Sequence, residues 1–78
     1  ICLKQFIVDE NTGFMGKSIR ESGIRSEHNC LIVGIEKNDG TLMSPVADEV
    51  LEKGEVVWVV GEENDVAHLL DGTKEKNA

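Results

Sequence analysis

The stretch CLIVGIEKNDGTLMSP, residues 30–45, decides the fold of this 78-residue chain. Residues 30–36 include three β-branched side chains and are almost continuously apolar, which is typical of a strand that is covered on both faces. Residues 37–40 supply Asn, Asp and Gly, which tolerate positive φ and favour a tight turn. We therefore expect a β-hairpin whose second strand ends at Pro45, because proline cannot donate to a sheet ladder.

The remaining segments predict an α+β domain. Two other apolar, β-branched runs predict strands, at residues 1–8 and 55–61. Residues 11–22 predict a first helix, and residues 62–72 predict a second with acids in its first turn and apolar residues at helical spacing. The expected fold class is α+β: a small βαβββα domain, with a mainly antiparallel sheet of about four strands and two short helices packed on it.

Local signals suggest where the short elements begin and end. Asn11 or Thr12 is expected to cap the first helix, and Gly23 stands where helices commonly stop. Residues 46–54 leave room for one or two further helical turns before the last strand. The polar stretch 73–78 is expected to be a disordered tail.

Composition bounds the class of protein. Seventy-eight residues make one domain at most, and a chain this short buries only about 60% of its unfolded surface, which invites a partner. Fifteen acids against eight bases give a net charge of −7, which disfavours nucleic acid and anionic membrane surfaces. The chain begins with Ile1, so we expect a fragment of a longer protein. Its two cysteines indicate a reducing compartment and no disulfide scaffold.

No residue pattern predicts a metal centre or a catalytic centre. Histidine and cysteine fall at no spacing that typically holds a metal, and no serine stands in a nucleophile motif. GFMGKS, residues 13–18, has neither the spacing of a dinucleotide fingerprint nor the length of a Walker loop. Its glycines therefore indicate close packing or a tight entry to the helix. A small enzyme is the least favoured of the functional hypotheses, and we expect no enzymatic activity.

Arg20 and Arg25 flank the end of the first predicted helix, just ahead of the buried strand. The planar guanidinium of Arg25 could grip an anionic ligand. The alternative is a surface ion pair with Glu21 or Glu27, which would contribute little to stability. Trp58, in the middle of the strand VVWVV, belongs to the core or to a subunit interface.

The order of motifs along the chain resembles the TrkA-C domain, also called the RCK C-terminal subdomain. That family shows a Gly-Lys-Ser/Thr helix start, an Ile/Leu-Arg pair, an apolar strand, a glycine-bearing hairpin, a proline, a Leu/Ile and a Gly-acid pair before a last strand. Here these are Gly16, Lys17, Ser18, Ile24, Arg25, 31–36, Asp39, Gly40, Pro45, Leu51, Gly54, Glu55 and 56–61. The resemblance covers residues 3 to about 70 and is strongest to the copies fused to Kef-type cation/proton antiporters. Glu55 replaces the usual Asp.

The resemblance implies a cytoplasmic regulatory domain over residues 1–72, on the cytoplasmic side of the bacterial inner membrane. It would serve a bacterial monovalent-cation (potassium) transporter or cation/proton antiporter, as a fused domain with the membrane part N-terminal to it or as a peripheral subunit. Such domains pair as homodimers, and some bind a small anionic ligand in the cleft between the copies, which biases the attached transporter. The alternative is a purely structural dimerisation module of a membrane transporter without a ligand.

The best-known ligand among these relatives is cyclic di-AMP, and the family pattern for it carries an arginine, an Asn-Ile pair and a proline. Leu31 stands where the asparagine is expected, so one base-recognising amide is missing, and His28 or Asn29 is the candidate to substitute for it. No metal, no other cofactor and no nucleic-acid partner is expected. His28 is also a candidate pH sensor, since histidine titrates near neutrality. The expected ligand-binding residues are Arg25, His28, Asn29, Ile32, Ser44 and Pro45.

Overall fold

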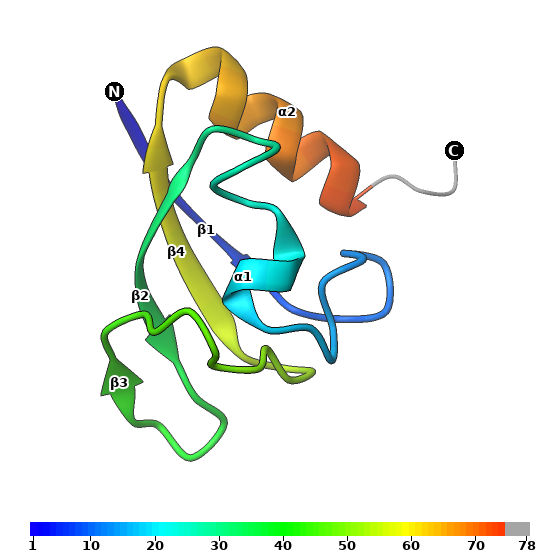
Figure 1. The fold of residues 1–78 in the computed structure, drawn as a ribbon, viewed down its shortest axis with the longest axis vertical. Helices are drawn as coiled ribbons and strands as arrows, with labels where there is room; N and C mark the ends of the chain where they lie inside the picture. The colour runs from blue at the N-terminus through cyan, green and yellow to red at the C-terminus, as the bar shows by residue number, and fades with distance from the viewer. Residues whose placement is uncertain (75–78) are drawn as a thin grey trace.

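The computed structural model describes residues 1–74 and shows helices and strands in the predicted order (Figure 1). They are β1 (Cys2–Ile7), α1 (Ile19–Ser22), β2 (Leu31–Glu36), β3 (Leu42–Met43), β4 (Val56–Gly61) and α2 (Glu63–Lys74). The strands form one sheet in the order β1-β4-β2-β3, and every neighbouring pair is antiparallel, which confirms the α+β prediction. α2 extends to Lys74, into the predicted tail at 73–78, and residues 75–78 of that tail lie outside the described residues.

One face of the sheet carries the hydrophobic core. Val57 and Val59 of β4 are fully buried there, together with Ile35 of β2. α2 packs on β1 and β4 and contributes Val66 and Leu69, which lie one helical turn apart and are almost completely buried. The alternation of buried and half-exposed residues along β4 therefore follows the two-residue period of a strand.

The opposite face of the sheet is apolar and exposed. The register aligns β1 and β2 with β4 so that Leu3 and Leu31 both pair with Val60, on the face that also carries Trp58. Leu3 and Leu31 keep 56% and 49% of their surface exposed. α2 packs on the core face, and α1 lies toward the same core (Figure 1). The described part of the chain therefore leaves this face uncovered.

α1 begins later than predicted, and Ser18 caps it. The Ser18 hydroxyl accepts a hydrogen bond from the Glu21 N–H at 3.2 Å, and the Glu21 carboxylate accepts one from the Ser18 N–H at 3.0 Å. This reciprocal pair is a capping box. Asn11 and Thr12, which were predicted to cap the helix, instead form local turns on Asp9. The predicted helix over 11–22 is therefore wrong except for its last turn.

Residues 46–54 contain no helix, contrary to the prediction. Their backbone groups bond instead to the chain that enters α1: Leu51 N–H donates to Lys17 O at 2.9 Å, and Ile19 N–H donates to Glu49 O at 2.9 Å. Leu51 is fully buried and fixes the middle of this segment in the core. Tertiary hydrogen bonds thus replace the helical bonds that a short amphipathic turn would have made.

Candidate functional site

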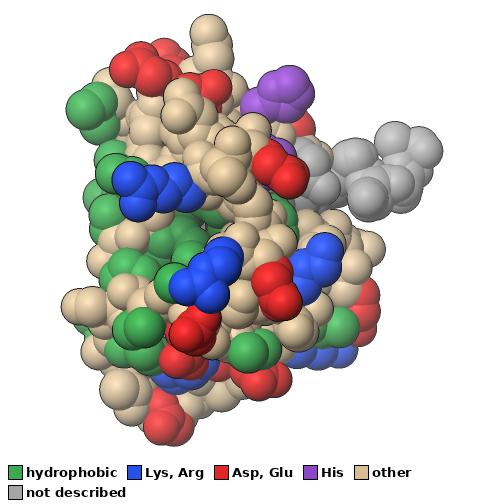
Figure 2. All heavy atoms as spheres, viewed as in Figure 1, with side chains coloured by type: hydrophobic (Ala, Val, Ile, Leu, Met, Phe, Trp, Pro, Cys, Tyr) green, Lys and Arg blue, Asp and Glu red, His purple; other side chains and the backbone are tan. Residues whose placement is uncertain are grey.

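An open groove of about 560 Å³ lies between α1, the connector that follows it, the start of β2 and residues 45–47. Its volume falls in the range of small-molecule sites, roughly 300–1,000 Å³. Figure 2 shows a hydrophobic hollow on this side of the molecule, with basic side chains at its border. The apolar lining comes from Ile19, Leu31, Ile32, Pro45 and Val46.

Two arginines border the groove, one on either side of Gly23. Gly23 follows α1 with φ 73°, a left-handed conformation that glycine adopts without steric cost, and it turns the chain into the connector. Arg20 Nη1 lies 2.7 Å from Asp48 Oδ1 on the surface. Within residues 1–74, the Arg25 side chain makes no ion pair with either neighbouring glutamate, nor any hydrogen bond. Arg25 therefore has all its donors available to an anion.

The structure brings three of the six predicted site residues together. Arg25, Ile32 and Pro45 line the same groove although they come from three separate segments. Ser44 lines a second hollow, of about 510 Å³, beside Trp58 on the outer side of the sheet. Successive side chains of an extended chain point to opposite sides, which explains why Ser44 and Pro45 separate.

His28 and Asn29 line a third hollow, of about 290 Å³, next to α2. Asn29 adopts φ 59°, and its Nδ2 donates to Asp65 Oδ2 at 3.3 Å. The ring of His28 meets that of Phe14 edge-on, with centroids 6.3 Å apart. These contacts place both residues beside α2 and outside the groove.

Sequence reasoning missed several residues of the groove wall, among them Ile19, Arg20, Val46 and Ala47. A signal for the first two was present, because the Ser-x-x-Glu pattern at 18–21 is typical of a capping box and places them in the first helical turn. No local pattern marks the other two. Their position depends on tertiary bonds, such as the one from Arg20 N–H to Ala47 O at 3.0 Å.

The described residues offer little material for other chemistry. No group of three or more histidine, cysteine or acidic side chains among residues 1–74 is arranged to hold a metal ion. Cys30 is fully buried, and burial, with a smaller effect from the charge of Asp65, raises the pKa of its thiol. Such a thiol stays protonated at neutral pH and is a poor nucleophile. Over the same range, no helix has the length and apolar character that crossing a bilayer requires.

Comparison with known proteins identifies the family. The chain belongs to the TrkA-C domain family, whose model matches residues 3–71. The RCK_C domain dimer of S. agalactiae BusR, solved in complex with c-di-AMP, is 30% identical with a TM-score of 0.76, over 94% of this chain and 95% of that one. The RCK C domain of the potassium transport protein KtrA, also in complex with c-di-AMP, has a TM-score of 0.75 at 22% identity, over 85% of this chain and 75% of that one. At that identity the KtrA likeness shows the fold alone.

One curated relative found by sequence is described as a potassium channel protein. Probable potassium channel protein 2 of Methanocaldococcus jannaschii is 24% identical over 74 residues, which is 95% of this chain and 22% of the relative. The chain spans between 8% and 22% of the length of the curated relatives that it matches. The comparison therefore concerns one domain of those longer proteins.

Proposed function

We propose that this chain is the ligand-sensing, dimerising regulatory domain of a bacterial monovalent-cation transporter or cation/proton antiporter, on the cytoplasmic side of the membrane. The groove is the observation that carries the proposal. It combines an apolar lining with the unpaired Arg25, in a domain whose 30%-identical relative was solved as a dimer with c-di-AMP. The proposed ligand is a small anion of the cyclic dinucleotide class, with cyclic di-AMP as the first candidate.

The chemistry of the groove suits a ligand that has both a phosphate and an aromatic base. The Arg25 guanidinium presents a planar fork of donors that matches a phosphate bidentately. Ile32 and Pro45 offer apolar surface against which a base can pack. Leu31 provides no hydrogen bond, and a base edge left unpaired there would cost about 1–3 kcal/mol. We therefore expect weaker binding than in a groove that carries an amide at this position.

A second copy would complete the site. The groove opens to solvent in the single chain, and a two-fold dimer places the same patch of each copy against the other. Each chain carries a net charge of −7, so an anionic ligand needs the local positive charge of Arg25 from both copies. Ligand that binds one dimer arrangement more tightly than another would shift the attached transporter between its states.

The test is calorimetric titration of the chain with cyclic di-AMP, run beside AMP, ATP and NADH. We expect saturation near one cyclic di-AMP per two chains, and loss of binding in Arg25→Ala. Lys4→Ala is the matched control, because it removes one positive charge from an exposed position on β1, across the sheet from the groove. Absence of heat with all four nucleotides, on a folded dimer, would refute the ligand-sensing role.

The exposed apolar face of the sheet favours a second candidate, a purely structural dimerisation module without a ligand. Large apolar side chains such as Leu3, Ile7 and Leu42 keep more than half of their surface exposed in the single chain. A saturable rise in melting temperature with ligand separates the two functions, since only a ligand-binding protein gains stability by mass action.

A further inference from the structure

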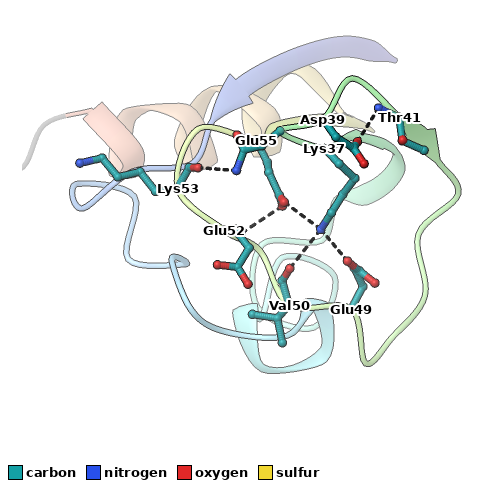
Figure 3. Close-up of polar contacts among 9 residues, drawn as sticks. Lys37, Asp39, Thr41, Glu49, Val50, Glu52, Lys53 and Glu55 are labelled. Atoms are coloured by element: carbon teal, nitrogen blue, oxygen red, sulfur yellow. Dashed lines mark hydrogen bonds and ion pairs between the residues drawn. The ribbon is translucent and has the colours of Figure 1, made fainter.

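Lys37, which directly follows β2, contacts three residues of the segment that forms one wall of the groove: Glu49, Val50 and Glu55 (Figure 3). The segment runs from 44 to 55, contains no helix or strand, and lines the groove with residues 45–47. Lys37 Nζ lies 2.5 Å from Glu49 Oε2 and 2.8 Å from Glu55 Oε2. The Glu55 side chain is only 2% exposed, so its carboxylate depends on these partners for its charge to be tolerated.

The remaining contacts of the cluster fix its geometry. Glu55 Oε1 accepts a hydrogen bond from the Glu52 N–H at 3.0 Å, and Lys37 Nζ also lies 3.5 Å from Val50 O. Burial acts to lower the pKa of Lys37, but the hydrogen bonds and charges of Glu49 and Glu55 outweigh it, so the pKa is raised. The ammonium is therefore charged at neutral pH.

Backbone hydrogen bonds join Glu49 and its neighbours to α1, which forms the other wall of the groove. Glu49 O accepts the Ile19 N–H at 2.9 Å, and Ala47 O accepts the Arg20 N–H at 3.0 Å. Ile19, Arg20 and Ala47 all line the groove, whereas Lys37 and Glu49 do not. A shift of the Glu49 backbone would thus move the 45–47 wall relative to α1.

We propose that Lys37 and Glu49 are positioning residues for the groove. Their ion pair fixes residues 45–47 against α1 and thereby sets the affinity for ligand, although neither side chain reaches it. The buried pair with Glu55 anchors the lysine, and the arm to Glu49 holds the wall. The effect on affinity rests on the proposed function, whereas the effect on the backbone bonds of α1 does not.

The experiment compares Glu49→Ala with Glu52→Ala, an exposed carboxylate of the same segment that makes no ion pair among residues 1–74. Titration with cyclic di-AMP measures affinity, and NMR hydrogen exchange measures protection of the Ile19 and Arg20 amides. We expect Glu49→Ala to bind about fivefold more weakly, as coupled positions outside a site commonly do. Both amides should exchange faster in that variant. Glu49→Gln, which keeps an acceptor for Lys37, should fall between it and wild type.

Each outcome decides the proposal. Equal affinity and equal exchange in Glu49→Ala and wild type would overturn it, as would the same losses in Glu52→Ala. Wild-type chain that does not bind cyclic di-AMP would refute the proposed ligand instead. In that case faster exchange at Ile19 and Arg20, confined to Glu49→Ala, would still support the positioning role, and unchanged exchange would overturn it.

Discussion

Replacing Lys37 with methionine should destabilise the domain by about 3 kcal/mol, because it leaves the Glu55 carboxylate buried without its cation. Removing one partner of a buried ion pair typically costs about 3–5 kcal/mol. The lower end applies because the Lys37 side chain is 20% exposed, so water partly reaches its place, although Glu55 is only 2% exposed. Methionine keeps a long apolar stem and so limits the loss of packing. Domains of this size have total stabilities of roughly 4–12 kcal/mol, so the loss is readily measured.

Urea unfolding, followed through the fluorescence of the single tryptophan, Trp58, measures this loss. Glu55→Gln and the double variant complete a double-mutant cycle that isolates the coupling between the two charges. The double variant should be more stable than Lys37→Met alone, because no unpaired charge then remains buried. A cost below about 1 kcal/mol for Lys37→Met, or a double variant whose loss is the sum of the two single losses, would refute the reasoning.

Three further predictions concern caps and turns. Ser18→Ala removes the N-cap of α1 and should cost about 1 kcal/mol, a fall in Tm of about 4–8 °C by circular dichroism. Backbone and side-chain hydrogen bonds with Ser18 lower the pKa of Glu21. The Glu21 carboxylate therefore stabilises the fold above its unfolded pKa near 4.5, and this stabilisation is lost as the pH falls through the folded pKa. A wild-type Tm that does not change over that acid range would contradict this prediction. Gly54→Ala should cost about 1–2 kcal/mol in urea unfolding, because Gly54 has φ 92° and a Cβ there would lie 2.7 Å from Asn38 Oδ1. An unchanged midpoint would disprove the conformational argument.

The long strands were predictable because their cause is local. β2 and β4 lie within one residue of the predicted ranges, since runs rich in β-branched residues favour extended backbone. The expectation that β2 is covered on both faces is wrong, because Leu31 and Val33 keep 49% and 50% of their surface exposed. The start of α1 was not predictable from the preference for N-cap residue types alone, because Asn11, Thr12 and Ser18 are all good caps. Only the glutamate three residues after Ser18 distinguishes the true cap. The conformation of 46–54 depends on bonds to residues remote in sequence, which no local pattern encodes.

Three of the six predicted site residues line the groove, and the separation of the other three from it has a physical reason. The resemblance to the TrkA-C pattern selected Arg25, Ile32 and Pro45, and the fold places these three in one groove. His28 and Asn29 were added as candidates to substitute for the amide missing at Leu31, and Ser44 was added because it precedes Pro45. A left-handed turn at residue 29 and the alternation of an extended chain send the added side chains elsewhere. Proximity along the chain is therefore a weak guide to a shared pocket.

On the uncovered face of the sheet, apolar side chains favour association, whereas the net charge of the chain opposes it. Its exposed leucines and isoleucine favour contact with any other apolar surface, while a net charge of −7 makes identical chains repel one another. That repulsion is screened over about 8 Å at physiological ionic strength, whereas the attraction between apolar faces acts only at contact and does not depend on charge. The salt concentration of the surrounding solution therefore governs how often two such faces meet. The acidic surface slows the association of identical chains, and dissolved ions weaken this effect by screening the charges.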